Sequence, residues 1–204
     1  MSASSRPLRV VAVSGSLTDP SRTTALVEAI VASVGRALPI ESHVITLNTL
    51  GPHLAGVLSR KGLPPEAEHE LAAIEKADLL VVATPVYRAS FTGLFKHLFD
   101  FVDQYALVDT PVLLAATGGS DRHALIIEHQ LRPLFGFFQS LALPVGVYAN
   151  DSDFTDYRIS NPQLDERIEK AVARALPLVR SALVEKETVE RQLAGEPASE
   201  ELDV

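Results

Sequence analysis

Short apolar runs alternate along the chain with longer stretches in which apolar residues recur at helical spacing. The short runs are rich in β-branched residues, a pattern typical of parallel strands that are buried on both faces. Five such runs predict strands at residues 8–15, 43–47, 78–85, 111–119 and 143–149. The longer stretches predict helices at residues 23–38, 64–77, 90–103, 121–141 and 161–183. This alternation predicts an α/β fold with a doubly wound, five-stranded parallel sheet and helices on both of its faces.

The chain of 204 residues is long enough for one well-buried domain and short for two. We assign residues 8–183 to this domain and residues 184–204 to an acidic C-terminal extension. The extension contains seven acidic and two basic side chains, so it holds −5 of the formal net charge of −8. Its first part continues the last predicted helix, and we expect its Gly/Pro/Glu-rich end to be disordered.

Composition excludes several classes of protein. The chain has no cysteine, which excludes disulfides, thiolate metal sites and cysteine nucleophiles, and its histidines have no spacing typical of a metal site. The negative net charge argues against a nucleic-acid partner, and no apolar run is long enough to cross a bilayer. Because the N-terminus also lacks a signal-peptide pattern, we expect a cytoplasmic protein.

The first candidate site is the loop after the first strand. In parallel doubly wound sheets, ligands bind beyond the carboxyl ends of the strands, near the switch in strand order. This loop has neither the glycines of a dinucleotide-binding turn nor a P-loop motif. It does combine hydroxyls and one arginine with the start of a helix, a combination that suits a phosphate group. The residues concerned are Ser16, Ser21, Arg22 and Thr23. The alternative is a polar loop whose hydroxyls only cap the helix.

Two further loops follow strands that end at the same end of the predicted sheet. The stretch "TPVYRASFTG" places Pro85, Val86 and Tyr87 where a flat ring could rest. The glycines of "TGGSD" let the backbone approach a ligand closely. Read separately, the first stretch is a turn in which Ser90 caps the following helix. The second is then a tight turn in which Ser120 or Asp121 caps the next helix. Together the three loops favour a ligand with one phosphate and a flat ring, and flavin mononucleotide (FMN) fits this description.

At this point the chain resembles a known family, the flavodoxin-like NAD(P)H-dependent FMN reductases of alkanesulfonate and methanesulfonate assimilation. The matching stretches are "GSLTDPSRTT", "ATPVYRASFTGLFKHLFD", "ATGGSDRHALIIEHQLRPLF" and "GVYANDSDFTDY". The resemblance implies that the phosphate site is formed by Ser16, Ser21, Arg22 and Thr23. It also implies that the ring-side contacts come from Pro85, Val86, Tyr87, Thr117, Gly118, Gly119 and Ser120.

The resemblance implies an activity as well. Such enzymes reduce FMN with NADH or NADPH, here with NADH slightly favoured, and FMNH₂ passes to a separate monooxygenase that cleaves a carbon–sulfur bond. A role in sulfur-poor cells would give a reason for a chain with no cysteine and one methionine. Two alternatives stay open. One is a quinone or azo reductase that retains FMN, and the other is a flavodoxin-type electron carrier, although this chain has no Trp and four Tyr.

We expect a distortion in the helix predicted at 121–141. Pro133 has no N–H and cannot bond the carbonyl of His129, so the helix should kink or bulge there. In the family that the chain resembles, this helix carries a π-type insertion at a subunit interface near the flavin, usually with Tyr. His129 matches that position and is the one side chain we list as catalytic, in a flavin or interface role. The alternative is a solvent-facing histidine.

The same helix suggests an assembly. With Phe135, Phe137 and Phe138 it is apolar on several sides, and such helices are usually buried on several sides. We therefore expect a homo-oligomer, and the resemblance implies a dimer or a tetramer.

Overall fold

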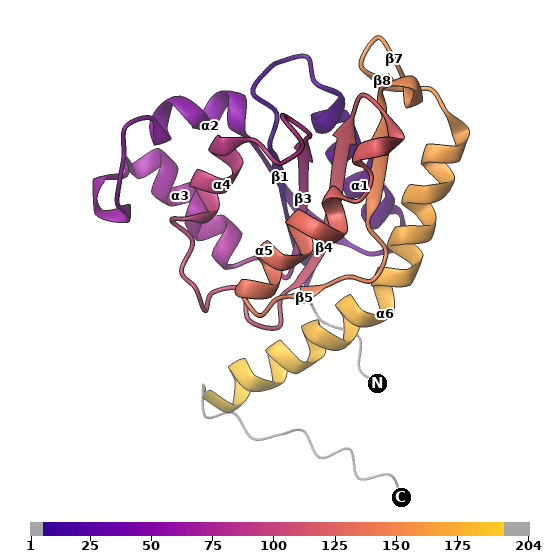
Figure 1. The fold of residues 1–204 in the computed structure, drawn as a ribbon. Helices are drawn as coiled ribbons and strands as arrows, with labels where there is room; N and C mark the ends of the chain where they lie inside the picture. The colour runs from indigo at the N-terminus through magenta and orange to yellow at the C-terminus, as the bar shows by residue number, and fades with distance from the viewer. Residues whose placement is uncertain (1–5, 194–204) are drawn as a thin grey trace, which may run out of the picture.

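A parallel sheet forms the centre of the molecule in the computed structural model, which describes residues 6–193 (Figure 1). The strand order is β2-β1-β3-β4-β5, with β6 also paired to β4. This is the flavodoxin-like order, in which ligands bind near β1 and β3. The strands are β1 (Leu8–Ser14), β2 (Ile40–Thr46), β3 (Leu79–Pro85), β4 (Pro111–Gly118), β5 (Leu141–Ala142) and β6 (Val147–Asn150). The predicted five-stranded parallel arrangement is confirmed.

The fifth strand position is interrupted, where the sequence predicted one strand over 143–149. β5 pairs with the start of β4 and β6 with its end, because Pro144 between them has no N–H for the ladder. Gly146 lies in the same gap. A Cβ there would be 2.7 Å from Ile127 Cγ2 and 3.0 Å from the Leu114 carbonyl oxygen, so only a glycine backbone fits. Proline and glycine thus divide one strand into two short ones.

Helices cover both faces of the sheet, as predicted. One face packs against α1 (Arg22–Ala37) and α6 (Pro162–Leu193). The other packs against α2 (Leu47–Leu54), α3 (Pro65–Glu75), α4 (Gly93–Phe99) and α5 (Arg132–Phe137). Most successive residues of β1 and β3 alternate between the two cores, which is why these strands are largely apolar. No described helix combines the length and the hydropathy needed to span a bilayer.

The helices differ from the predictions in three places. α2 was not predicted, α4 is much shorter than the expected 90–103, and the expected helix at 121–141 is broken. That stretch contains a 3₁₀ turn η2 (Asp121–His123), a π-helix η3 (Ile127–Leu131) and then α5. The N–H of Arg132 donates to the Ile127 carbonyl, five residues back, which is the π spacing. The predicted bulge around His129 is therefore confirmed.

The C-terminal extension begins as a continuation of α6, as expected, and the helix runs to Leu193. Lys186 ties this part to the sheet, because its Nζ donates to the Ala77 carbonyl oxygen at 3.1 Å and pairs with Asp78 Oδ1 at 3.1 Å. Residues 194–204, where disorder was expected, lie outside the described residues.

Candidate active site

The three predicted loops meet at the carboxyl end of the sheet and are joined by direct hydrogen bonds. The Gly15 N–H donates to the Ala83 carbonyl oxygen at 2.7 Å, which links the first loop to β3. The Val86 N–H donates to the Thr117 carbonyl oxygen at 2.8 Å, which links the second loop to β4. The hydroxyls of Thr23 and Thr117 lie 2.7 Å apart in a buried contact, which links the first loop to the third. The predicted site is therefore one connected surface.

Buried hydroxyl groups concentrate at this end of the sheet. Seven side chains of this kind lie in or beside the loops, namely Ser14, Ser16, Ser21, Thr23, Thr84, Thr92 and Thr117. Each has a partner, so the polar surface is well ordered before any ligand binds. A preordered polar surface lowers the cost of fixing a charged ligand.

In the first loop one hydroxyl caps the helix, and two backbone N–H groups beside it stay open. Ser21 is the N-cap of α1, and its Oγ accepts the Thr24 N–H at 3.2 Å. This cap leaves the N–H groups of Arg22 and Thr23 without acceptors among residues 6–193. Together with the helix dipole, these two donors favour an anion. Arg22 begins the helix, and its side chain is 42% exposed, so the guanidinium can reach a ligand outside the loop.

The second loop is a tight hairpin, and the alternative with Ser90 as a helix cap is wrong. Tyr87 and Ser90 exchange both backbone hydrogen bonds around Arg88 and Ala89, whose φ values are +53° and +67°. Two left-handed residues in succession are typical of a type I′ turn. Thr92 caps α4 instead, since its Oγ1 accepts the Phe95 N–H at 3.3 Å. The hairpin carries the exposed Tyr87 beyond the sheet.

In the third loop, Gly118 is needed for a different reason from the one expected. A Cβ on Gly118 would lie 2.3 Å from the hydroxyl oxygen of Tyr148, so the space that glycine leaves is filled by this ring. The Tyr148 hydroxyl donates to the Ser120 carbonyl oxygen at 2.6 Å and thereby supports the loop. Burial and nearby carboxylates, Asp121 first, raise the pKa of Tyr148 and keep it protonated as a donor.

The backbone N–H groups of the second and third loops differ in whether they have an acceptor. The N–H groups of Val86 and Tyr87 are used within the protein, by the Thr117 and Ser90 carbonyls. Those of Gly119 and Ser120 have no acceptor in the described part of the chain. The end of the third loop therefore supplies the open backbone donors, and the second loop supplies the apolar surface of Pro85, Val86 and Tyr87.

Replacing Gly118 with alanine is expected to destabilise the fold by about 1–3 kcal/mol, the usual cost of overpacking, because the new Cβ collides with Tyr148. Tyr148→Phe removes the hydroxyl, and the ring atom nearest to the new Cβ is then Cζ, at 3.3 Å. Gly118→Ala should therefore cost less in a Tyr148→Phe variant than in the wild type. Urea unfolding of the wild type, both single variants and the double variant measures this difference. An equal cost in both backgrounds would disprove the packing argument.

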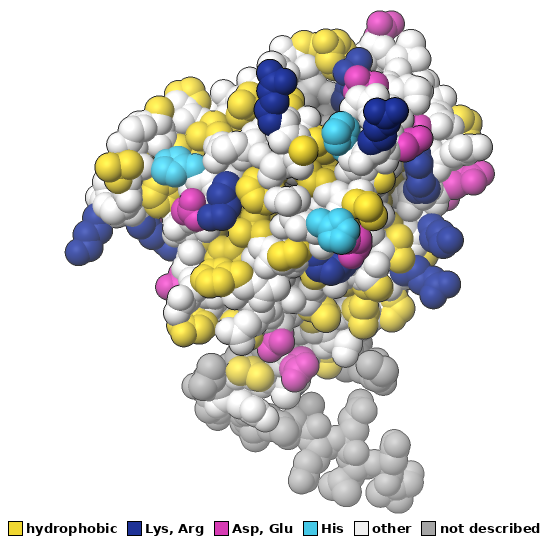
Figure 2. Space-filling view, in the orientation of Figure 1, with side chains coloured by type: hydrophobic (Ala, Val, Ile, Leu, Met, Phe, Trp, Pro, Cys, Tyr) yellow, Lys and Arg dark blue, Asp and Glu magenta, His cyan; other side chains and the backbone are white. Residues whose placement is uncertain are grey.

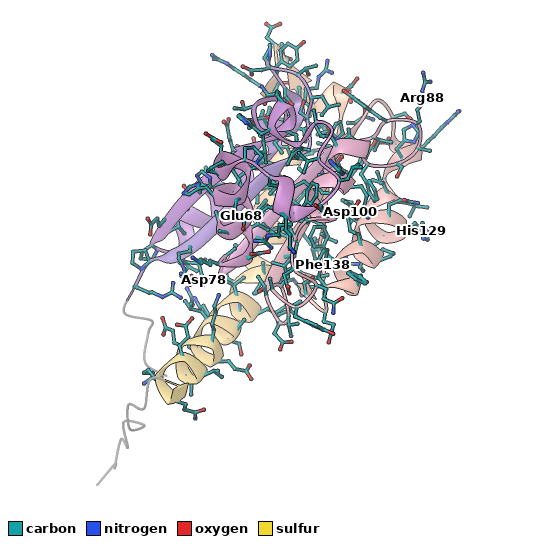
Figure 3. The ribbon with its side chains drawn as sticks, turned by 90° about the vertical axis from the view of Figure 1, so that its left-hand side faces the viewer. Glu68, Asp78, Arg88, Asp100, His129 and Phe138 are labelled. Atoms are coloured by element: carbon teal, nitrogen blue, oxygen red, sulfur yellow. The ribbon has the colours of Figure 1, made fainter. Side chains whose placement is uncertain are left out.

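His129 lies at the surface of the molecule. Its side chain is exposed, and Figure 3 shows it on the same side of the molecule as Arg88. Its neighbour Gln130 accepts a hydrogen bond from the Ser90 hydroxyl at 3.2 Å, so the π-helix contacts the second loop. Among residues 6–193, no group of three acidic or histidine side chains could hold a metal ion.

Sequence reasoning missed the residues that come from the loop after β6. Asp151 begins a 3₁₀ turn, η4 (Asp151–Asp153), and Tyr157 lies in the hairpin of β7 (Phe154–Thr155) and β8 (Arg158–Ile159). Both contact the Arg22 guanidinium, Asp151 through an ion pair and Tyr157 through its ring. The predicted topology could have indicated these residues, because the fifth strand ends at the same end of the sheet as the first, third and fourth.

The residues present fit FMN. Arg22, two open N–H groups and several hydroxyls are the groups that would hold one phosphate, while an apolar turn and open backbone donors lie at the same end of the sheet. A single arginine with a helix N-terminus matches one phosphate monoester.

Comparison with known proteins agrees with this chemistry. The family model described as NADPH-dependent FMN reductase matches residues 8–155. The NADH-dependent FMN reductase SfnF of Pseudomonas fluorescens (strain Pf0-1) is 59% identical over 174 residues, which are 85% of this chain and 93% of that protein. The FMN reductase (NADPH) of Pseudomonas aeruginosa is 55% identical over 172 residues, 84% of this chain and 92% of that protein.

A solved structure gives the same result. An oxidoreductase from Corynebacterium diphtheriae has a TM-score of 0.75 and 33% identity, and the match covers 86% of this chain and 98% of that one. The resemblance seen in the loop motifs is thus confirmed over most of the fold. The chain belongs to the NADPH-dependent FMN reductase family and is an oxidoreductase that uses FMN and NAD(P)H.

Proposed function

We propose that this reductase uses FMN as an exchanging substrate and supplies FMNH₂ to a separate sulfonate monooxygenase. The observation that carries the first part is the exposure of the site, because Arg22 at its phosphate end and Tyr87 at its ring end are both more than one-third exposed. A flavin held there could leave without a large opening of the protein. The second part is supported by the resemblance described above and by a chain with no cysteine and one methionine.

In this proposal the protein positions its ligands and performs no covalent chemistry of its own. The bound flavin supplies the redox chemistry by accepting a hydride from the reduced nicotinamide. Arg22, Thr23 and Ser16 hold the phosphate, with Ser21 fixing the helix start behind them. The Gly119 and Ser120 N–H groups donate to the ring, while Thr117 joins their loop to Thr23. Pro85, Val86 and Tyr87 would supply the apolar contacts of the ring.

The test is steady-state oxidation of NADH and NADPH by the purified protein, with and without added FMN, after its visible spectrum has been recorded. The proposal predicts a colourless protein whose turnover saturates with added FMN. A yellow protein that ignores added FMN and reduces quinones would indicate the retained-FMN reductase instead. For the delivery step, sulfite release by a sulfonate monooxygenase should require this protein, FMN and reduced nicotinamide together.

NADH is proposed as the favoured donor. Arg88 and Arg122, the arginines closest in sequence to the ring-side loops, are exposed and make no ion pair with any described residue, so neither is fixed to hold a 2′-phosphate. The two Pseudomonas relatives are named for different nicotinamides, one for NADH and one for NADPH. The ratio of kcat/KM for NADH and NADPH decides between them. The reaction is assigned to the cytoplasm, where both nicotinamides are available.

The proposed assembly is a homo-oligomer, a dimer or a tetramer, formed through the face that contains η3 and α5. Figure 2 shows hydrophobic side chains spread over this face, and Leu125 and Phe137 are 62% and 64% exposed. The exposed His129 lies on the same segment, so the proposal places it at the interface.

Phe137→Asp is therefore expected to convert the oligomer to a monomer, because a carboxylate would be buried without a partner in the interface. Light scattering after size exclusion measures the mass directly. Leu58→Asp is the matched control, since Leu58 is 94% exposed on the loop between α2 and α3. An unchanged mass for the Phe137 variant would contradict this interface.

A further inference from the structure

Arg22, the arginine of the proposed phosphate site, already has an anionic partner within the protein. Its Nη1 atom lies 3.3 Å from Asp151 Oδ1, and the Asp151 side chain is 50% exposed. Asp151 directly follows β6, the strand that pairs with the end of β4, so it reaches the phosphate site from a fourth loop. Arg22 is the one ion-pair partner of Asp151 among residues 6–193.

The backbone that carries Asp151 is firmly held by a neighbouring carboxylate. Asp153 is buried, and its Oδ2 accepts the Asn150 N–H at 2.8 Å and the Arg167 guanidinium at 2.9 Å. Its Oδ1 accepts the side-chain amide of Asn161 at 2.6 Å. Asp153 thus stabilises the turn, whereas the Asp151 carboxylate has no hydrogen bond within the turn and faces Arg22. Asp153 and Asp151 therefore have different roles.

A second group orients the same guanidinium. The Arg22 Cζ atom lies 5.5 Å from the centre of the Tyr157 ring, within the range of a cation–π contact. Tyr157 occupies the tight turn between β7 and β8, where Asp156 and Tyr157 have φ values of +47° and +61°. Arg22 is therefore held between a carboxylate and an aromatic ring before FMN arrives.

We propose that Asp151 and the FMN phosphate compete for Arg22, so that FMN binding exchanges one anionic partner for another. This inference rests on the proposed function, because it requires the phosphate to bind at Arg22. A phosphate monoester carries about −1.5 to −2 charges at pH 7, so it also repels the Asp151 carboxylate. The exchange lowers the affinity for FMN below what Arg22 alone would provide. When the flavin dissociates, Asp151 forms its ion pair with Arg22 again, which favours the release of flavin to a second enzyme.

The test is the affinity of Asp151→Asn for FMN and for riboflavin, measured by flavin fluorescence. Asparagine has nearly the same shape and no charge. FMN is expected to bind about two- to fivefold tighter, the effect typical of one exposed ion pair, and riboflavin, which has no phosphate, equally well. Asp121→Asn is the matched control, because Asp121 lies at the same end of the sheet but accepts from Asn150 Nδ2 at 3.1 Å and is not paired with Arg22.

A double-variant cycle separates exchange from simple repulsion. In an Arg22→Ala background, Asp151→Asn should tighten FMN binding less than in the wild type, because only the repulsion between carboxylate and phosphate remains to be removed. Tightening of the same size in that background would overturn the exchange in favour of repulsion alone. Weaker binding by Asp151→Asn would also overturn it, and would mean that Asp151 only orients Arg22.

The result also distinguishes this inference from the proposed site itself. If the wild type binds FMN and riboflavin equally well, the phosphate site is wrong and the inference fails with it. If the wild type prefers FMN but Asp151→Asn leaves its affinity unchanged, the site stands and only the competition is overturned.

Discussion

Arg22→Ala is expected to weaken FMN binding about 10- to 100-fold, because a charged hydrogen bond to phosphate contributes about 1.5–3 kcal/mol. Riboflavin affinity should stay the same, since the lost contact is to the phosphate alone. Folding should change little, because the Arg22–Asp151 pair joins two half-exposed side chains. Arg22→Lys should retain part of the affinity, because an ammonium group keeps the charge but loses the bidentate geometry. Flavin fluorescence titration gives all of these dissociation constants.

Arg88→Ala serves as the control for this prediction. Arg88 is an exposed arginine in the second loop, on the turn between Tyr87 and Ser90, and it has no ion pair within the described residues. Its loss should leave the FMN affinity unchanged. Equal affinities of the Arg22→Ala variant and the wild type for FMN would exclude Arg22 from the phosphate site.

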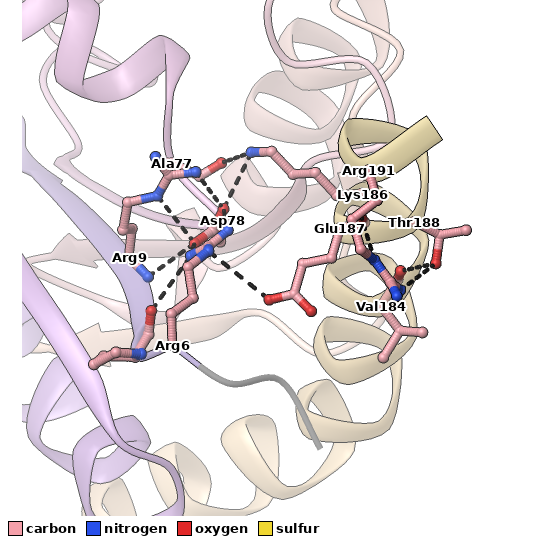
Figure 4. Close-up of polar contacts among 10 residues, drawn as sticks. Arg6, Arg9, Ala77, Asp78, Val184, Lys186, Glu187, Thr188 and Arg191 are labelled. Atoms are coloured by element: carbon pink, nitrogen blue, oxygen red, sulfur yellow. Dashed lines mark hydrogen bonds and ion pairs between the residues drawn. The ribbon is translucent and has the colours of Figure 1, made fainter. Parts of the chain in front are cut away.

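Asp78→Asn is expected to lower the free energy of unfolding by about 3–5 kcal/mol, the cost of breaking a buried ion pair. The Asp78 side chain is fully buried and faces Arg6, Arg9 and Lys186 (Figure 4). Its Oδ2 also accepts the Arg9 backbone N–H at 3.0 Å. Neutralising this carboxylate removes the anion that Arg6, Arg9 and Lys186 share and loosens the hold on the end of α6, while Arg6 keeps its ion pair with Glu187.

The control for Asp78 is Asp100→Asn. Asp100 pairs with Lys96 four residues earlier on α4, and both side chains are exposed, so the change should cost less than about 0.5 kcal/mol. Urea unfolding at pH 7 compares the two variants. A similar small loss for both would mean that the buried cluster stabilises the fold no more than a surface pair.

The stability difference between wild type and Asp78→Asn should depend on pH. Burial alone would raise the pKa of Asp78, but hydrogen bonds from Arg6 and Arg9 outweigh it and hold the pKa well below its ordinary value. A carboxyl group of this kind stabilises the fold above its unfolded pKa, near 3.9, and loses that contribution as pH falls toward its folded pKa. The difference should therefore be full at pH 7 and smaller at pH 3.

The sequence was sufficient for the centre of the sheet because β3 and β4 are buried and apolar on both faces, which leaves little room for another interpretation. It was insufficient for α2, since Gly51 and Pro52 disfavour a helix and packing against α3, α4 and β2 stabilises one there. The break between β5 and β6 follows from Pro144 and Gly146, which could have been anticipated. The bulge at His129 was anticipated, because Pro133 removes a specific N–H.

For the candidate site, topology was the useful guide. Strands that end at the same end of the sheet bring their loops together, so the three predicted loops are joined as expected. Asp151 and Tyr157 were missed because their placement depends on the segment after β6 folding back beside α1. No local pattern in that segment indicates this contact. Gly118 shows the same limit, because its partner is a tyrosine 30 positions along the chain.

The most direct test of the flavin site is a crystal structure of this protein with FMN bound. We expect the phosphate within hydrogen-bond distance of Arg22 and of the N–H groups at the start of α1. The ring should lie against Pro85–Tyr87 and the loop of residues 117–120, with Asp151 no longer paired to Arg22. A flavin bound at another end of the sheet, or a phosphate out of reach of Arg22, would contradict the assignment of this site.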